Sequence, residues 1–240
     1  VKKINIYGND ITSENVIRNQ FEVDEGDPYN EILVNKSINN LKSLNFFKTV
    51  NKTILVDENT KTKTINISIE EKPTGEISAG AGIGTNGSVI SFILKENNYL
   101  GEGNTVGFDF TLSEDSIKGR LDFTNPNYDF LGNSINYYVS STTNDKPDQG
   151  FENTISGAGI NTSFEQFRDI YASLGLSLDH DDLSTTGDAS ESLKKQSGEF
   201  TELSANYGFS FDKRNRSFMP TDGSIASFNI DSNAFFTTGS

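Results

Sequence analysis

The chain has 240 residues, a formal net charge of −14 and a hydrophobic fraction of 33%. That fraction is low for one large buried core, and an acidic surface repels nucleic-acid phosphate, so nucleic-acid binding is not expected. The lack of Cys excludes disulfides and thiolate metal sites. No apolar run reaches the roughly eighteen residues of a membrane-spanning helix.

Residues 1–73 predict a small α+β domain with the order strand, helix, helix, strand, strand. Thr12 or Ser13 can cap the first helix, and a second helix is expected from about Asn30. The apolar residues of the second helix have the three-and-four spacing of one buried stripe: Leu33, Val34, Ile38, Leu41 and Leu44. The predicted strands are 3–7, 47–56 and 62–72. Two helices on one face of such a sheet make a self-contained domain.

Beyond Pro73 the pattern changes to repeated strands with period-two alternation. The predicted strands are 75–84, 87–96, 104–113, 117–125, 134–142, 153–163, 169–179, 199–212 and 224–236. Segments of about ten alternating residues separated by turn residues are the signature of a transmembrane β-barrel. Charged residues fall on the face away from the apolar row, where a wet lumen could solvate them: Asp109, Arg120, Asp122 and Glu202.

The turns of this region alternate in character. Thr85-Asn86-Gly87 has the Asn-Gly signature of a tight hairpin. Segments 141–152 and 180–198 are polar and acidic, and we expect long loops there, mobile over 184–198. At the opposite end, Gly101 and Gly132 each follow an aromatic-Leu pair, and we expect them to supply positive φ.

Several segments, taken in order, resemble one family, the BamA-type outer-membrane protein assembly factors with their periplasmic POTRA domains. In the N-terminal part they are Ile4-Asn5-Ile6-Tyr7-Gly8-Asn9, Val16-Ile17-Arg18 and Leu41-Lys42-Ser43-Leu44-Asn45-Phe46-Phe47-Lys48-Thr49-Val50. Further on they are Glu70-Glu71-Lys72-Pro73-Thr74-Gly75, Gly80-Ala81-Gly82-Ile83-Gly84, Asn98-Tyr99-Leu100-Gly101, Thr124-Asn125-Pro126-Asn127-Tyr128 and Phe218-Met219-Pro220-Thr221-Asp222-Gly223. The resemblance covers essentially the whole chain. Asn45 departs from the family's usual Gly, although Asn tolerates a left-handed conformation.

The resemblance implies an α+β POTRA domain at residues 1–73, in the periplasm, with the order β-α-α-β-β. It implies that residues 74–240 form the N-terminal part of a transmembrane antiparallel β-barrel in the outer membrane, about nine of sixteen strands. The implied function is noncatalytic and needs no cofactor or metal: the protein receives unfolded outer-membrane proteins and helps insert them. Accessory assembly lipoproteins and outer-membrane lipid are the other expected partners.

Two strand edges are the candidate binding sites. A first barrel strand crowded with Gly and Ala pairs weakly, so it can act as a lateral gate that offers its edge to a client strand. The candidate gate residues are Glu76, Ile77, Ser78, Ala79, Gly80, Ala81, Gly82 and Ile83. The POTRA edge strand is the second candidate, through Phe47, Lys48, Thr49, Val50, Asn51 and Lys52. A covered edge in the POTRA domain, and simple crowding of small residues in the barrel, are the structural alternatives.

Other functions stay open as alternatives. A TamA-like assembly factor or a two-partner secretion transporter would share this architecture. From different classes, a passive porin or a soluble β-sandwich binding module would account for the strands alone. An enzyme is not expected, because His180 is the single His and no nucleophile motif accompanies it. The basic cluster Lys213-Arg214-Asn215-Arg216 is interpreted as a solvated periplasmic turn, with contact to lipid headgroups or a partner's acids as the alternative.

Overall fold

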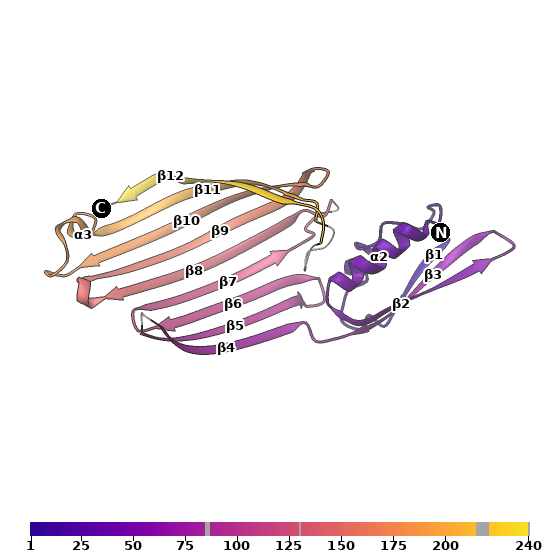
Figure 1. Cartoon of the computed structure of the whole chain (residues 1–240), viewed down its shortest axis with the longest axis horizontal. Coiled ribbons are helices and arrows are strands. Elements are labelled where there is room, and N and C mark those ends of the chain that lie inside the picture. The colour runs from indigo at the N-terminus through magenta and orange to yellow at the C-terminus, as the bar shows by residue number, and fades with distance from the viewer. Residues whose placement is uncertain (85–86, 130, 215–220, 240) are drawn as a thin grey trace. The chain divides into compact units, whose positions relative to one another are not determined.

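The computed structural model describes residues 1–84, 87–129, 131–214 and 221–239 (Figure 1). The chain divides into two compact units. The first contains Val1–Glu76 together with Glu96–Thr105, and the second contains Ile77–Lys95 and Val106–Ser240. The hairpin residues Thr85 and Asn86, and the segment from Asn215 to Pro220, lie outside the described residues.

The first unit is the predicted α+β domain. Its elements are β1 (Lys3–Tyr7), α1 (Glu14–Arg18), α2 (Glu31–Ser43), β2 (Phe47–Asp57) and β3 (Thr62–Glu71). The sheet order is β1-β3-β2, with β1 parallel and β2 antiparallel to β3. The predicted order β-α-α-β-β is therefore confirmed, and β2 and β1 are the edges of this sheet.

Helix α2 supplies much of the core of this unit. Asn30, near which the helix was expected to begin, caps it by accepting hydrogen bonds from the backbone N–H groups of Ile32 and Leu33. Val34 and Leu41 are fully buried. The whole predicted stripe takes part in the core, which also contains Ile4, Ile17, Ile65 and Ile67 from the first helix and the sheet. The three-and-four spacing thus identified the buried face.

The second sheet has nine strands, and each strand neighbours the next in sequence (Figure 1). The strands are β4 (Gly75–Gly84), β5 (Gly87–Tyr99), β6 (Asn104–Ser113), β7 (Ser116–Asn125), β8 (Ser134–Lys146), β9 (Phe151–Phe167), β10 (Ile170–Thr185), β11 (Gly198–Asp212) and β12 (Ile225–Gly239). This is one open antiparallel sheet rather than two packed sheets, so the β-sandwich alternative is wrong.

Two hairpins extend beyond their predicted ends. The chain turns from β8 to β9 through the short helix η1 (Pro147–Gln149), so the predicted loop 141–152 is mostly strand. Side-chain pairs continue across this extension, with Thr143 Oγ1 3.0 Å from Thr154 Oγ1 and Ser141 Oγ 2.9 Å from Ser156 Oγ. The loop prediction was wrong because Ser and Thr pair across strands even where the segment is polar.

Most of the predicted loop 180–198 is a connection, but both of its ends lie within strands. Strand β10 runs to Thr185, and β11 starts at Gly198. The remaining connection contains the short helix α3 (Glu191–Lys194), which Ser190 caps through a hydrogen bond from the backbone N–H of Leu193. No helix among the described residues is long and apolar enough to cross a membrane.

The register separates the two faces of the sheet. One row across β8–β12 contains Ile135, Thr162, Leu174, Tyr207 and Ile230. The next row contains Asn136, Asn161, Gly175, Asn206 and Asp231. Because successive side chains of a strand point to opposite faces, one face is largely apolar and the other polar.

Candidate functional site

Strand β4 forms one edge of the nine-stranded sheet. Within the part of the chain that the structure describes, β5 is the only strand beside β4. The eight predicted gate residues are all exposed: Glu76, Ile77, Ser78, Ala79, Gly80, Ala81, Gly82 and Ile83. Ile77 is 71% exposed and Ile83 is 91% exposed. An edge strand of this kind presents unpaired backbone N–H and C=O groups to a further strand.

Glycines leave the middle of β4 with little side-chain packing. A Cβ at Gly80 would lie 3.2 Å from Ser91 Oγ, whereas a Cβ at Gly82 would meet nothing within 4 Å. The neighbouring Ala79 and Ala81 are also exposed. Because Gly and Ala contribute little packing, the pairing of this strand depends mainly on backbone hydrogen bonds.

The start of β4 is held more firmly than its middle. The backbone N–H and the side-chain Nδ2 of Asn97 both donate to the Thr74 carbonyl, at 3.3 and 3.1 Å. Thr74 Oγ1 also donates to the Glu96 carboxylate, which accepts the backbone N–H of Asn98 at 2.9 Å. The candidate gate is therefore anchored at its first residues and weakly packed beyond them.

Strand β2 is the second candidate edge, and its six predicted residues divide into two groups. Phe47 and Val50 are each only 7% exposed and belong to the core. Lys48, Thr49 and Asn51 are exposed, and Lys52 Nζ contacts Asn35 Oδ1 on α2. A partner at this edge would therefore meet the backbone together with the exposed group, while Phe47 and Val50 hold the strand on the core.

The exposed end of this edge carries one ion pair. Lys48 Nζ lies 2.8 Å from Glu70 Oε1 on the adjacent strand β3. The hydrogen bond to Glu70 and the charge of Glu70 raise the pKa of Lys48 above its usual value. Lys48 is thus engaged within the sheet, although its side chain remains accessible to solvent.

The turn between β5 and β6 belongs to the first unit, and sequence reasoning missed its contacts. Asn98 Nδ2 donates to Thr12 Oγ1 at 2.9 Å in a buried hydrogen bond. The backbone N–H of Gly103 donates to Asn98 Oδ1 at 2.8 Å, and that of Ser13 donates to the Gly101 carbonyl at 2.8 Å. Thr12 is therefore no helix cap. Ser13 occupies the cap position of α1 without a side-chain hydrogen bond.

Glu71 holds the segment before α1. Its carboxylate accepts the backbone N–H of Ile11 at 2.8 Å and that of Thr12 at 2.7 Å. Burial acts to raise the pKa of Glu71, but the hydrogen bonds from Thr12 and from the backbone of residues 10–12 outweigh it and lower the pKa below its usual value. The Glu-Glu pair before Lys72-Pro73 was recognised in the sequence, but its partners were not.

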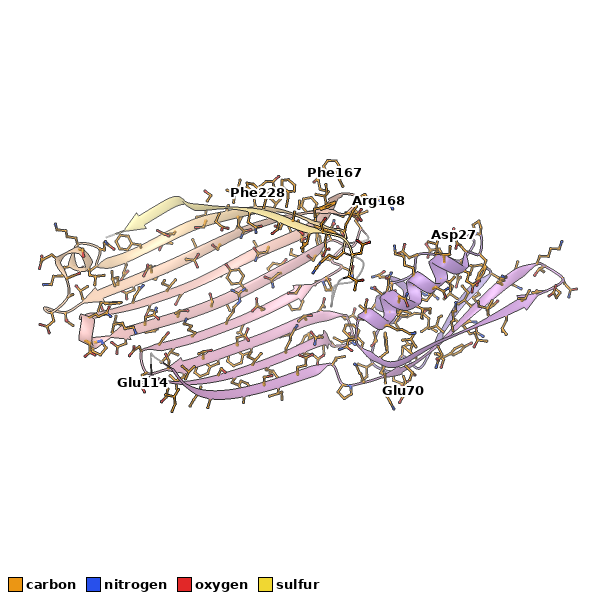
Figure 2. The ribbon with its side chains drawn as sticks, in the orientation of Figure 1. Asp27, Glu70, Glu114, Phe167, Arg168 and Phe228 are labelled. Carbon is orange, nitrogen blue, oxygen red and sulfur yellow. The ribbon has the colours of Figure 1, made fainter. Side chains whose placement is uncertain are left out.

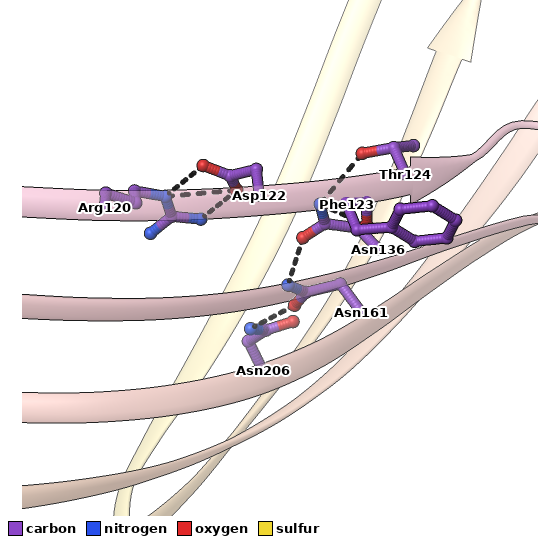
Figure 3. A network of polar contacts seen from close by, with 7 residues as sticks. All are labelled: Arg120, Asp122, Phe123, Thr124, Asn136, Asn161 and Asn206. Carbon is purple, nitrogen blue, oxygen red and sulfur yellow. Dashed lines mark hydrogen bonds and ion pairs between the residues drawn. The ribbon is translucent and has the colours of Figure 1, made fainter. Parts of the chain in front are cut away.

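A polar network crosses the second sheet on its polar face (Figure 3). Asn206 Nδ2 donates to Asn161 Oδ1 at 3.4 Å, and Asn161 Nδ2 donates to Asn136 Oδ1 at 3.3 Å. Asn136 Nδ2 then donates to Thr124 Oγ1 at 2.9 Å. Gly175 separates Asn161 from Asn206 in the register, and a Cβ there would lie 2.2 Å from Asn161 Oδ1. The missing side chain lets the network span β10.

The charged residues of β7 lie on the same face, as predicted. Arg120 pairs with Ser140 in the register, whereas its neighbour Leu121 pairs with Val139. Arg120 Nη2 lies 2.8 Å from Asp122 Oδ1 (Figure 3). The guanidinium also lies 4.0 Å from the Tyr138 ring centre. The face thus carries paired charges and amides in place of an apolar core.

The single His of the chain, His180, lies on strand β10. His180 Nδ1 lies 3.0 Å from Thr201 Oγ1 on β11. Among the residues that the structure describes, no group of three His, Cys, Asp or Glu side chains is arranged to hold a metal ion.

Two family models match the chain. The Omp85 superfamily domain matches residues 98–240, and the POTRA model, described as a surface antigen variable number repeat, matches residues 1–72. Among curated proteins, the outer membrane protein assembly factor BamA of Neisseria meningitidis serogroup B is 27% identical over 187 residues, covering 75% of this chain and 24% of that protein. BamA of Neorickettsia risticii is 25% identical over 232 residues, covering 93% of this chain and 30% of that protein.

Solved structures show the same fold. The crystal structure of BamA from Haemophilus ducreyi lacking POTRA domains 1–3 has a TM-score of 0.80 at 22% identity, over 98% of this chain and 48% of that one. CdiB from Acinetobacter baumannii has a TM-score of 0.58 at 12% identity, over 100% of this chain and 46% of that one. The chain spans less than half of each of these relatives. It belongs to the Omp85 superfamily, and it joins a POTRA domain to an open nine-stranded sheet in the same way as the BamA proteins to which it is similar.

Proposed function

We propose that the protein containing this chain receives unfolded β-barrel proteins in the periplasm and helps insert them into the outer membrane at β4, without catalysing a covalent reaction. Superfamily membership places the sheet in the outer membrane and the POTRA segment in the periplasm. The observation that carries the proposal is the glycine-rich and weakly packed middle of strand β4. Both curated relatives are named outer membrane protein assembly factors.

The physical basis is strand addition. A free edge aligns the backbone of an extended client strand by hydrogen bonds, and weak side-chain packing lets the edge separate again from the strand that closes the barrel. In lipid, an unpaired backbone group costs several kcal/mol, so a client gains free energy as each of its own strands pairs. The folding of the client therefore drives its insertion, and no nucleotide is needed.

The POTRA edge offers an earlier contact. The exposed residues Lys48, Thr49 and Asn51 leave β2 accessible from the solvent, so an unfolded client or an accessory lipoprotein can add a strand there. We also propose residues 1–73 as the POTRA domain and residues 74–240 as the barrel portion. The turn Glu96–Thr105 is then a barrel turn that packs within the POTRA unit.

Site-directed disulfide capture tests the gate. The 240 residues contain no Cys, so a single Cys at Ser78 of the full-length protein, with any other Cys removed, can report one position. We expect a disulfide with a Cys in the last strand of a stalled client barrel protein. Ser141 lies on β8 with a paired strand on each side, so Ser141→Cys is the matched control and should capture little.

The opposite outcome would favour secretion through the lumen. A two-partner secretion transporter carries a passenger past the polar face, so capture at Asp109 or Glu202 by an exported passenger, with none at Ser78, would contradict the gate. The likeness to CdiB from Acinetobacter baumannii is one of fold at 12% identity and supports no choice between the two functions. A passive porin gives no reason for the POTRA domain.

A further inference from the structure

The apolar face of the second sheet is not uniformly covered by side chains. A hollow of about 690 Å³ lies over β8–β12. Its lining includes Tyr128, Leu174, Leu176, Ala205, Tyr207 and Ile230. Most of these side chains are partly exposed, so the hollow opens to whatever surrounds the barrel.

The register explains why a hollow forms here. Along one row of this face the side chains are large on β8–β10 and small on β11 and β12: Tyr137, Ile160, Leu176, Ala205 and Ser232. In the adjacent row Tyr207 and Ile230 stand beside Ala205 and Ser232. Small residues next to large ones leave a depression that the sheet itself does not fill.

The surroundings of the hollow decide what can occupy it. In the outer membrane the apolar face of a barrel meets lipid hydrocarbon, and an apolar lining offers an ion or a polar ligand little compensation for lost water. The row of Leu176 is six residues from Ile170 at the β9–β10 turn, roughly 20 Å along the strand. With a tilt of about 40° this corresponds to roughly 15 Å of depth, about one leaflet of hydrocarbon. An acyl chain anchored at the turn would therefore reach the hollow.

Basic residues are concentrated in the turns at the end of the sheet where β10 begins. Of the nine basic residues that the structure describes in 74–240, three lie in the β9–β10 and β11–β12 connections: Arg168, Lys213 and Arg214. The two turns meet, since Lys213 Nζ lies 3.8 Å from Asp169 Oδ2. Arg214 is held by Asp212, with Nη2 2.6 Å from Oδ2. Arg168 and Lys213 are both exposed, and the 3.8 Å contact of Lys213 with Asp169 is much longer than that of Arg214 with Asp212, so these two cations can approach a phosphate.

Aromatic side chains mark the same end as an interface. Phe167 is 65% exposed and Phe228 is 59% exposed, and Figure 2 shows both at this end of the sheet together with Arg168. Lys213 Nζ lies 5.5 Å from the Phe211 ring centre. Aromatic belts lie at the level of lipid headgroups. This end joins the strands to the periplasmic domain through the chain, so it faces the periplasmic leaflet.

We propose that this surface is a binding site for one anionic glycerophospholipid of the periplasmic leaflet. One acyl chain fills the hollow beside Leu176 and Ala205, and Arg168 and Lys213 hold the headgroup phosphate. The site is independent of the gate strand β4, which lies at the opposite edge of the sheet.

Photolabelling in vesicles tests the site on the full-length protein. The probe is phosphatidylglycerol with a diazirine in its acyl chain, diluted into phosphatidylcholine vesicles, and adducts are located by peptide mass spectrometry. We expect adducts to concentrate around Leu176 and Ala205. Ala205→Phe or Ser232→Leu should fill the hollow and reduce them at least fivefold. Loss of both Arg168 and Lys213 charges, as Gln, should reduce them more than tenfold at about 1 kcal/mol per cation.

Matched variants separate this site from general lipid contact. Val139→Phe adds bulk on the same face outside the hollow, and Lys195→Gln removes an exposed cation beyond α3, so both should label as the unmodified protein does. Every variant is first shown to be folded by its mobility on an unheated gel. Adducts spread evenly over the apolar face, or equal yields from a phosphatidylcholine probe with the same diazirine, would overturn the proposal.

Discussion

Glu71 accepts hydrogen bonds from two consecutive backbone N–H groups, and the second belongs to the residue whose side chain meets Asn98. The carboxylate binds Ile11 and Thr12, and Thr12 Oγ1 accepts the hydrogen bond from Asn98 in a buried setting. Hydrogen bonds to a charged acceptor are the stronger ones. One carboxylate therefore positions the segment against which the β5–β6 turn packs.

Glu71→Gln should loosen this segment. The amide lacks the charge and keeps one accepting oxygen, so we expect the local opening free energy to fall by about 1–2 kcal/mol and amide protection at Ile11 and Thr12 to fall roughly tenfold in hydrogen exchange. Glu70→Gln is the control, because Glu70 pairs with Lys48 at the surface. If Glu71→Gln and Glu70→Gln lowered the protection of Ile11 and Thr12 equally, the role of Glu71 in holding this segment would be contradicted.

The same group predicts a pH dependence. The pKa of Glu71 is lowered in the folded chain, so its contribution to stability is complete above the ordinary Glu pKa of about 4.3. That contribution is lost as the pH falls through the lower folded value. We expect the exchange of the Ile11 and Thr12 amides to show this acid-dependent opening in the unmodified protein and to lose it in Glu71→Gln.

Gly101 is required for a different reason. Its φ is +76°, and a Cβ would lie 2.0 Å from the Ile11 carbonyl oxygen. Gly26 has a φ of +104° but nothing within 4 Å of the same position. Gly26→Ala should therefore cost only the backbone penalty, about 1–2 kcal/mol, and Gly101→Ala should cost more. Chemical unfolding of the POTRA unit measures the free energy of unfolding of both variants. Equal losses of stability would show that the Ile11 carbonyl oxygen does not crowd a side chain at position 101.

At the scale of the element, β4 combines an anchored start with a weakly packed middle. The Asn97 and Glu96 side chains hold Thr74, whereas Gly80 and Gly82 add no side chain to the sheet. Such a strand can change its partner without disturbing the turn from which it begins. A central strand has no such freedom, because neighbours pair with it on both sides.

Gly82→Thr tests whether this weakness matters. The position has open space, so Thr should fit and raise the β-propensity of the strand by up to about 1 kcal/mol. We expect client insertion to slow severalfold while the protein itself stays folded. Gly119 on β7 also has nothing within 4 Å of an added Cβ, so Gly119→Thr is the matched control. Unchanged insertion in Gly82→Thr, or an equal loss in Gly119→Thr, would argue against the gate.

At the scale of the whole sheet, the two faces meet different solvents. The face of Leu178 belongs next to lipid, and the face of Ser177 next to water in the lumen. Leu178 is opposite Ala158 and Leu203 in the register, whereas Ser177 is opposite Gly159 and Ser204. Adjacent residues on one strand therefore experience opposite environments.

This difference predicts opposite responses to one substitution. Leu178→Lys near the middle of β10 should destabilise the inserted barrel by about 2–4 kcal/mol, whereas Ser177→Lys should be tolerated near Asp179. Folding titrations of the full-length protein in vesicles measure both. A Leu178→Lys variant as stable as Ser177→Lys would mean that this face does not meet lipid.

The sequence predicted local features with clear physical signatures. Helix periodicity predicted the stripe of α2 and its start near Asn30, and Asn45, Gly101 and Gly132 have the positive φ that their positions suggested. Hairpin ends were harder to predict: Thr143 and Thr154 continue a ladder through a segment whose polarity indicated a loop. Polarity reports solvent exposure and does not distinguish a loop from a solvated strand.

The sequence by itself determined which residues of each strand share the apolar face, because apolar and polar residues alternate along the strand. It also determined the order of the POTRA elements and the glycine-rich character of β4. Only the tertiary structure decided that Thr12 meets Asn98, 86 residues away, and that Gly175 lets an amide network cross β10. Such pairs depend on strand register and on the packing of distant turns. The alternation of residues within one strand determines neither the register nor the packing.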